Sequence, residues 1–322
     1  MANTFKMVRS TVSSMISGIV RSVFSVASLF KDGQQGFWYD PTEIDTLYQD
    51  SAGTTPVTLA GEPVGLVIDK SGNTNNATQS ISASRPTYNV NPERLTLDKV
   101  DDSIIVNIPT GGWVGSMVLA TDQGTASYGV NIPAGDYEIG GIYFPGDTIN
   151  NVLIREGVVS ASDLAQTEAT FVAGGAKASY GDVTDFTSYW REMGGLTSFP
   201  LIDTSSGTSF YAAWRNNSLT SFPLIDTSSG NSFAYAWYGN STLVDFPASF
   251  FDNCLATNFT NAFITTNLSQ TSIDGILVSI NSNNTRNGTF NQSGGSAPSA
   301  TGEAAITAMR SRGWTVTVTG GF

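Results

Sequence analysis

Few side chains in this chain are suited to catalysis, and most of those are carboxylates. The sequence contains no histidine, which removes the most common general base and zinc ligand, and its single cysteine, Cys254, has no partner for an internal disulfide. Asp203 and Asp226 occupy equivalent positions 23 residues apart, and paired carboxylates can hydrolyse glycosides. Because duplication of a segment explains this pair, we interpret it as repeat structure and expect no catalytic residue and no cofactor site.

A second acidic group consists of Asp98, Asp101 and Asp102. Carboxylate oxygens at this spacing could ligate a hard cation such as calcium. Aspartates in turns more often accept hydrogen bonds from neighbouring backbone N–H groups, and we favour that interpretation. The sequence also lacks a G-x-G-x-x-G phosphate cradle and a Walker-type loop, so no metal or nucleotide site is predicted.

The length, charge and amino-acid composition of the chain limit the classes of protein to which it can belong. The chain has 322 residues, enough for two or three domains, and carries 15 Lys and Arg against 27 Asp and Glu. Its net charge of −12 and the absence of a basic cluster exclude nucleic acid as a predicted partner. The abundance of Gly, Ser, Thr and Asn is typical of turn-rich β proteins on extracellular and virion surfaces.

The element that would position Asp203 and Asp226 is an internal repeat. The segment LTSFPLIDTSSG occurs at residues 196–207 and again at 219–230. Elements of the form Phe-x-x-x-Trp/Phe begin at positions 186, 210, 233 and 259, so the spacings are 24, 23 and 26 residues. A period of this length predicts a solenoid over residues 172–267, in which stacked coils bury one another's apolar faces.

Each coil reads as a short strand, a turn led by proline, a polar loop and a short helix that begins before the Phe-x-x-x-Trp element. Apolar residues that recur in step should form core ladders, namely Phe199/Phe222/Phe246, Leu201/Leu224, Phe210/Phe233 and Trp214/Trp237. Aromatic residues outside these ladders should face outward, since Tyr211 aligns with Ala234 and Tyr235 with an alanine of the previous coil. With Tyr238 they predict a surface for contact with a glycan or a protein.

Residues 1–35 form a basic N-terminal arm. Its apolar residues are spaced 4, 3, 4, 3 and 4 apart, which is the seam of a heptad helix: Val12, Ile16, Ile19, Val23, Val26 and Phe30. β-Branched seam residues favour three or more strands, so a homotrimer is the expected oligomer. A docking arm on another protein is an equal alternative. A signal peptide or membrane anchor is less favoured, because Arg21 interrupts the apolar stretch.

Residues 36–171 predict an antiparallel β domain. Strands are expected at 64–68, 104–108, 117–120, 137–144 and 151–155, followed by a helix at 161–171. Three sequence motifs, DKSGNTNNATQ at 69–79, SRP at 84–86 and LTLDKVDDSI at 95–104, resemble the opening strands of concanavalin A-like, laminin-G-like modules. The segment LIREGVVS at 153–160 resembles their closing strand. The resemblance implies a shortened, jelly-roll-like β-sandwich, because the stretch is shorter than a complete module.

Residues 268–322 should form a capping module for the solenoid. Helices are expected at 273–280 and 303–312, and strands at 288–291 and 314–318. The two middle coils resemble leucine-rich repeats of the bacterial surface-protein type, which are widespread in tailed-phage proteins, and the segment RGWTV at 312–316 resembles the closing module of those phage proteins. The fold class expected is therefore mainly β with short helices: a helical arm, a sandwich, an α/β repeat solenoid and a cap.

The combination resembles a non-enzymatic structural protein of a tailed-phage particle. We expect a fibre or spike at the virion surface, assembled in the host cytoplasm and bound to other virion proteins through the N-terminal arm without membrane insertion. The repeat domain would attach to a glycan or protein of the host surface. Alternatives are a head decoration protein, a bacterial cell-surface adhesin and, from another class, a carbohydrate-active enzyme.

Overall fold

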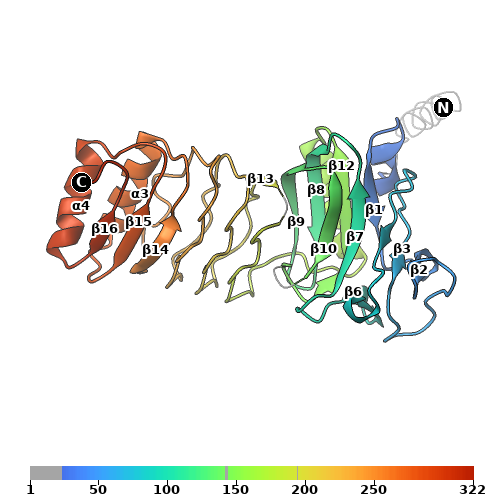
Figure 1. Ribbon diagram of the computed structural model, residues 1–322. Coiled ribbons are helices and arrows are strands. Elements are labelled where there is room, and N and C mark those ends of the chain that lie inside the picture. The colour runs from blue at the N-terminus through green and yellow to red at the C-terminus, as the bar shows by residue number, and fades with distance from the viewer. Residues whose placement is uncertain (1–23, 142–143, 194) are drawn as a thin grey trace, which may run out of the picture.

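The computed structural model describes residues 24–141, 144–193 and 195–322. In this part of the chain the fold is mixed and mainly β, with antiparallel sheets and three α-helices. The elongated molecule carries two facing sheets at one end, a stack of chain turns in the middle and a helical layer at the other end (Figure 1). One continuous cluster of buried apolar side chains runs through all three parts, from Phe37 to Val318.

Two five-stranded antiparallel sheets form the N-terminal part. The first has the order β1 (Gly36–Tyr39), β12 (Asn151–Glu156), β8 (Trp113–Ala120), β9 (Thr125–Ile132) and β13 (Leu196–Ser198). The second has the order β10 (Gly135–Gly140), β7 (Ser103–Ile108), β4 (Ala77–Thr78), β3 (Leu66–Val67) and β2 (Leu47–Tyr48). A small third sheet contains β11 (Thr148–Ile149), β6 (Glu93–Thr96) and β5 (Thr87–Val90), and short 3-10 helices lie at Val26–Phe30 (η1), Ile44–Thr46 (η2) and Ser82–Ser84 (η3).

The first sheet is apolar on both faces because both faces are covered. On β8, Met117 and Leu119 belong to the core between the sheets, whereas the alternate residues Val118 and Ala120 belong to a second cluster. That cluster covers the outer face with η1 and with α2 (Ala161–Ala173), whose Phe171 is buried. Alternation of side chains along a strand thus supplies one core on each side of the sheet.

The motif DKSGNTNNAT is a structural corner. Asp69 is buried, and its Oδ1 accepts hydrogen bonds from the backbone N–H groups of Trp38 (2.9 Å) and Ser71 (2.8 Å). The side-chain amide of Asn75 donates to Gly36 O at 2.8 Å. The motif therefore joins the start of β1 to the loop between β3 and β4, which satisfies backbone groups that strand pairing leaves free.

The repeated segments lie side by side in register. The N–H groups of Phe210, Ala212 and Trp214 donate to carbonyl oxygens one period further along the chain, those of Ser232, Ala234 and Ala236, at 2.9 Å each. The same pattern joins the segment that starts at Phe186 to the one at Phe210, and the one at Phe233 to the one at Phe259. Parallel bridges link Asp185, Ser209, Ser232 and Asn258 in turn.

Three ladders of parallel aromatic rings fill the interior of the stack. In the first, Phe186, Phe210, Phe233 and Phe259 follow one another at 5.0–5.4 Å between ring centroids, with interplanar angles of 5–8°. In the second, Trp190, Trp214, Trp237 and Phe263 follow at 4.9–5.7 Å. The third contains Phe199, Phe222 and Phe246 at 5.2 and 5.7 Å, and its rings meet the tryptophans edge to face.

Two buried asparagines add a polar ladder. The side-chain amide of Asn217 donates to Trp190 O and Trp214 O, and that of Asn240 donates to Trp214 O and Trp237 O. The stack ends in a parallel sheet of β14 (Asn258–Phe263), β15 (Thr289–Gln292) and β16 (Thr315–Thr317). The helices α3 (Gln270–Ser282) and α4 (Ala300–Ser311) form the connections between these strands.

Most predicted strands and helices of the two ends are confirmed in position; the strand expected at 137–144 is instead β10, which spans Gly135–Gly140. The strands expected at 104–108 and 151–155 are β7 and β12, and the helix expected at 161–171 is α2. At the C-terminal end, α3, β15, α4 and β16 lie within three residues of their predicted bounds. The predicted antiparallel pairing of residues 36–171 is also confirmed.

Two predictions for the repeated segments are wrong. Leu201 and Leu224 do not join the core, since their exposed fractions are 75% and 55%, while Ile225, next in sequence, is 4% exposed. Neighbouring residues of an extended chain point to opposite sides, so only one of each Leu-Ile pair can face inward. No helix forms at the Phe-x-x-x-Trp/Phe elements: those that begin at Phe186, Phe210 and Phe233 are turns, and the one at Phe259 lies in β14. In each, the residue two positions after the Phe has a positive φ: Ser188, Ala212, Tyr235 and Asn261.

The structure describes only two of the six residues of the predicted N-terminal seam. Val26 and Phe30 are buried in the second cluster, against Leu153 and Phe171 of their own chain. These two residues therefore have a partner within the monomer. Val12, Ile16, Ile19 and Val23 lie outside the described residues, and their predicted role in anchoring or oligomerisation stays a prediction.

The ring ladders predict that two substitutions of Trp237, to Ala and to Phe, differ in how much they destabilise the fold. Its indole N–H is buried without a hydrogen-bond partner in the described structure, and the next ring on this ladder is Phe263. Trp237→Ala should therefore lower the free energy of unfolding by about 3–5 kcal/mol, whereas Trp237→Phe should cost much less. Urea titrations of both variants measure this difference, and equal losses would contradict the packing described.

Candidate binding surface

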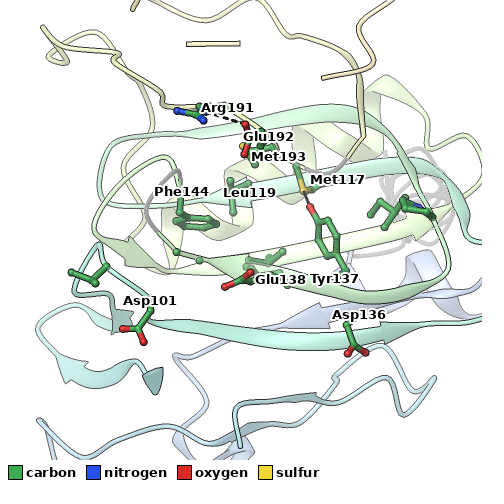
Figure 2. Close-up of a pocket in the computed structure, with 17 residues that line it drawn as sticks. Asp101, Met117, Leu119, Asp136, Tyr137, Glu138, Phe144, Arg191, Glu192 and Met193 are labelled. Atoms are coloured by element: carbon green, nitrogen blue, oxygen red, sulfur yellow. Dashed lines mark hydrogen bonds and ion pairs between the residues drawn. The ribbon is translucent and has the colours of Figure 1, made fainter. Parts of the chain in front are cut away.

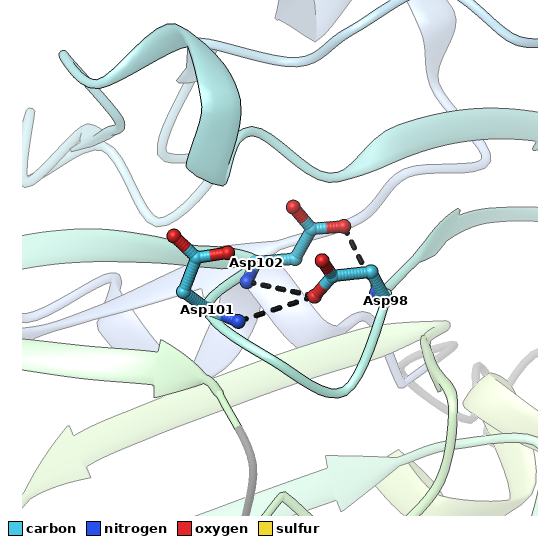
Figure 3. A group of neighbouring side chains, drawn as sticks. All are labelled: Asp98, Asp101 and Asp102. Atoms are coloured by element: carbon cyan, nitrogen blue, oxygen red, sulfur yellow. Dashed lines mark hydrogen bonds between the residues drawn. The ribbon is translucent and has the colours of Figure 1, made fainter.

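The acidic group of the β6–β7 loop is a hydrogen-bonded turn (Figure 3). Asp98 Oδ1 accepts from the backbone N–H groups of Val100 (2.8 Å), Asp101 (3.2 Å) and Asp102 (3.2 Å). In return, Asp102 Oδ2 accepts from Asp98 N at 2.9 Å. Carboxylate oxygens of the three aspartates lie within 4.8 Å of one another, but those of Asp98 and Asp102 already serve the backbone, as the sequence interpretation favoured.

The electrostatics of the turn agree with this role. The hydrogen bond from Val100 N, followed by those from the other backbone donors, holds the pKa of Asp98 below its ordinary value. Burial, and then the negative charges of Asp98 and Asp101, raise the pKa of Asp102. Ionised Asp98 is thus the form that the turn stabilises.

Asp203 and Asp226 each close a local turn on the exposed side of the stack. Asp203 Oδ1 accepts from Ser205 N (3.1 Å) and Ser205 Oγ (2.7 Å), and Asp226 Oδ1 makes the same two contacts with Ser228 (2.9 and 2.7 Å). The hydrogen bonds from Ser205 lower the pKa of Asp203. A glycosidase needs one carboxylic acid with a raised pKa as its proton donor, so Asp203 is tuned in the opposite direction.

A cavity of about 560 Å³ lies between the two five-stranded sheets (Figure 2). Met117 and Leu119 of β8 and Ile139 of β10 give it an apolar lining. Tyr137 points across it, with its hydroxyl 3.9 Å from the sulfur of Met117, and burial raises the pKa of Tyr137 to about 12. Among the described lining residues no nucleophile stands beside a general base.

The three predicted surface tyrosines lie together on one face of the stack. Tyr211 and Tyr235 contact edge to face with 5.7 Å between ring centroids, and Tyr235 and Tyr238 lie 5.9 Å apart. Tyr211 is 42% exposed, and the other two are half-buried. The structure thus brings Tyr211, Tyr235 and Tyr238 into one cluster, which we call the tyrosine face.

The backbone places Tyr235 in a conformation that tyrosine disfavours. Its φ of 60° lies in the left-handed region, and the equivalent residue of the next period is Asn261, with a φ of 54°. Asparagine tolerates this region, whereas a bulky side chain there costs on the order of 1–2 kcal/mol. Ser188 and Ala212 share this conformation, so it belongs to the repeat, and Tyr235 is the bulkiest side chain that bears its cost.

An arginine, Arg215, also belongs to the tyrosine face, and the sequence pattern did not predict it. The guanidinium of Arg215 lies over the rings of Tyr238 (4.9 Å) and Tyr235 (5.7 Å). Its side chain forms no hydrogen bond or ion pair with the described residues, and its Nε is buried. The available signal was positional: Arg191 and Arg215 are the only Lys or Arg between Lys177 and Arg286, and each directly follows a ladder tryptophan.

Glu192 lies beside this cation but is engaged elsewhere. Its Oε1 accepts from Arg191 Nε at 3.1 Å and from Asn216 Nδ2 at 3.0 Å. Partial burial acts to raise the pKa of Glu192, but these hydrogen bonds and the charges of Arg191 and Arg215 lower it overall. The face therefore combines three tyrosine rings with one guanidinium that forms no ion pair with a described residue.

Comparison of the chain with protein families, with curated proteins and with solved structures gives no significant match. In the described part of the chain, no helix combines the length and the apolar character needed to cross a membrane.

The Asp98 turn predicts a pH effect on stability. Because the pKa of Asp98 is lower in the folded state than its ordinary 3.8, ionised Asp98 stabilises the fold above that pH, and the contribution disappears as pH falls through the lowered value. Asp98→Ala should thus reduce the melting temperature at pH 7, and its difference from wild type should shrink as pH falls below 3.8, with exposed Asp45→Ala as the control. Millimolar calcium should leave the wild-type melting temperature unchanged; an increase that Asp98→Ala abolishes would indicate a cation site.

Proposed function

We propose that this chain is a non-enzymatic structural protein of a tailed-phage particle, a fibre or spike that is anchored by its N-terminus and attaches to the host surface. The observation that carries the proposal is the tyrosine face on a rigid stack. Tyrosines offer large, rigid contact area and a hydroxyl at small cost in conformational entropy, and they dominate many recognition surfaces. Here the underlying ladders hold them in place.

The stack supports a solenoid, in which repeated coils of the leucine-rich-repeat type display one extended face. Register-matched hydrogen bonds and three ring ladders join successive periods of 23–26 residues. The facing antiparallel sheets support the shortened lectin-like sandwich. Because each coil contacts only its neighbours, such a surface favours binding to a partner over a deep catalytic site.

The polarity of the molecule supports anchoring at one end and display at the other. The first described residues, in η1, pack on the outer face of the sheet that contains β1 and β12, and the repeated segments extend in the opposite direction toward α4 (Figure 1). An arm at residues 1–35 would thus attach on the far side of the sandwich from the tyrosine face. Attachment to other virion proteins, with a homotrimer favoured, fits this arrangement.

Immunogold electron microscopy with an antibody against residues 172–322 tests the location. Label on the tail of purified particles is the expected result. Label on the head would select the alternative of a decoration protein. Label restricted to uninfected bacterial cells would select an adhesin and would contradict a virion protein.

The tyrosine face can be removed by replacing two of its tyrosines, each with the residue that stands at the equivalent position of another period. Tyr211 aligns with Thr187 and Thr260 of other periods, and Tyr235 aligns with Asn261. The double variant Tyr211→Thr/Tyr235→Asn should keep its melting temperature yet bind host cells about tenfold or more weakly, because buried interface tyrosines often contribute about 2 kcal/mol or more each. Cell binding of fluorescently labelled protein measures this.

The matched control is Leu201→Thr, which removes an exposed apolar side chain outside the tyrosine face. It should bind cells like wild type. If the double variant also binds like wild type, the attachment surface lies elsewhere on the molecule.

A further inference from the structure

The tyrosine face also suggests the chemical class of its ligand. We infer that the ligand is a glycan that carries a carboxylate, with Arg215 as the residue that binds the carboxylate. This inference rests on the proposed function, since it concerns the same face.

Arg215 is pre-positioned and its hydrogen-bonding capacity is unused. The rings of Tyr235 and Tyr238 hold its guanidinium by cation–π contact, which restricts the rotamers of a long side chain. None of its donors binds a described residue, and the nearby carboxylate of Glu192 is held by Arg191 and Asn216. A planar guanidinium in this state matches a carboxylate through two parallel N–H···O bonds.

The surrounding charge argues against a dense polyanion. Residues 178–285 contain eight acidic residues and only two basic ones, Arg191 and Arg215, and the whole chain carries a net charge of −12. This excess of negative charge in the repeated segments disfavours nucleic acid or a heavily sulfated chain as the ligand. A ligand with separate carboxylates can bring one to Arg215 without placing others against the acidic residues.

The tyrosines fit the rest of such a ligand. An acidic sugar has an apolar C–H face next to its carboxylate, and a tyrosine ring offers an apolar surface with a hydroxyl at its edge. Tyr211 is the most exposed of the three rings and contacts Tyr235, on which the guanidinium lies. The sugar ring can therefore rest on tyrosine while its carboxylate reaches Arg215.

The test uses the full-length protein and immobilised oligosaccharides that contain glucuronic, galacturonic or sialic acid, each paired with its methyl ester. Esterification removes the charge and keeps the sugar. We expect wild-type protein to bind at least one acid about tenfold or more tightly than its ester, the factor typical of a charge-assisted hydrogen bond. Arg215→Met should lose this preference, and Arg215→Lys, which keeps the charge without the planar fork, should keep only part of it.

Arg286→Met is the control, because it removes an exposed arginine outside the tyrosine face. It should retain wild-type binding. Equal binding of acid and ester, or an unchanged preference in Arg215→Met, would overturn the inference. If no sugar of the panel binds while the protein still binds host cells through the tyrosines, the carboxylate inference fails and the proposed attachment function stands. If the protein binds neither sugars nor cells, the attachment function fails as well.

Discussion

Stacking of aromatic rings between successive periods of the chain is the interaction on which the rest of this structure depends. A single period carries a Phe, a Trp and a second Phe that it cannot cover alone. When periods stack at the spacing of hydrogen-bonded strands, each ring is covered by its counterparts above and below at 5–6 Å. The period of about 23 residues is therefore the length of chain that returns these three side chains to register.

At each end of the stack, the outermost aromatic rings have a neighbouring period on one side only, and other parts of the chain cover their second side. At the N-terminal end, Trp190 packs against Tyr180 and donates its indole N–H to Tyr128 Oη at 3.1 Å, and β13 pairs with β9. At the C-terminal end, Phe259 and Phe263 pack against Phe290 of β15. The two-sheet part and the helical part thus complete the core of the repeats and share it with them.

Much of this organisation could be predicted from the sequence, because the repeat is nearly identical in two copies and keeps large aromatic residues in step. The ladders of Phe210 and Trp214 followed directly from that periodicity. The position of Leu201 did not, since Leu and Ile are neighbours in the sequence and hydrophobicity alone does not select which one faces inward. The buried role of Asn217 was equally hidden, because a polar residue beside a turn usually signals a loop.

The candidate site, too, could be predicted from the sequence only in part. Exchange of Tyr for Ala between copies suggested that Tyr211 and Tyr235 face outward; in the structure Tyr211 is exposed, Tyr235 is half-buried, and the two rings are in contact. Arg215 also recurs in sequence with Arg191, but its contacts with Tyr235 and Tyr238 join two neighbouring periods, and both periods have a positive φ that Ala212 and Tyr235 do not signal as residue types. Backbone geometry of this kind is set by the stack as a whole, so it could not be predicted from local propensity.

The direction of the hydrogen bonds within the stack has a mechanical consequence. They run from one period to the next, so a pull between an anchored N-terminus and a ligand held at Tyr211 or Tyr235 loads them in series along the stack. Under such a load the periods would separate one at a time, and each period of 23 residues would release about 80 Å of extended chain. If the chain has the proposed attachment function, the stack would act as an extensible tether that lengthens in discrete steps before the contact is lost.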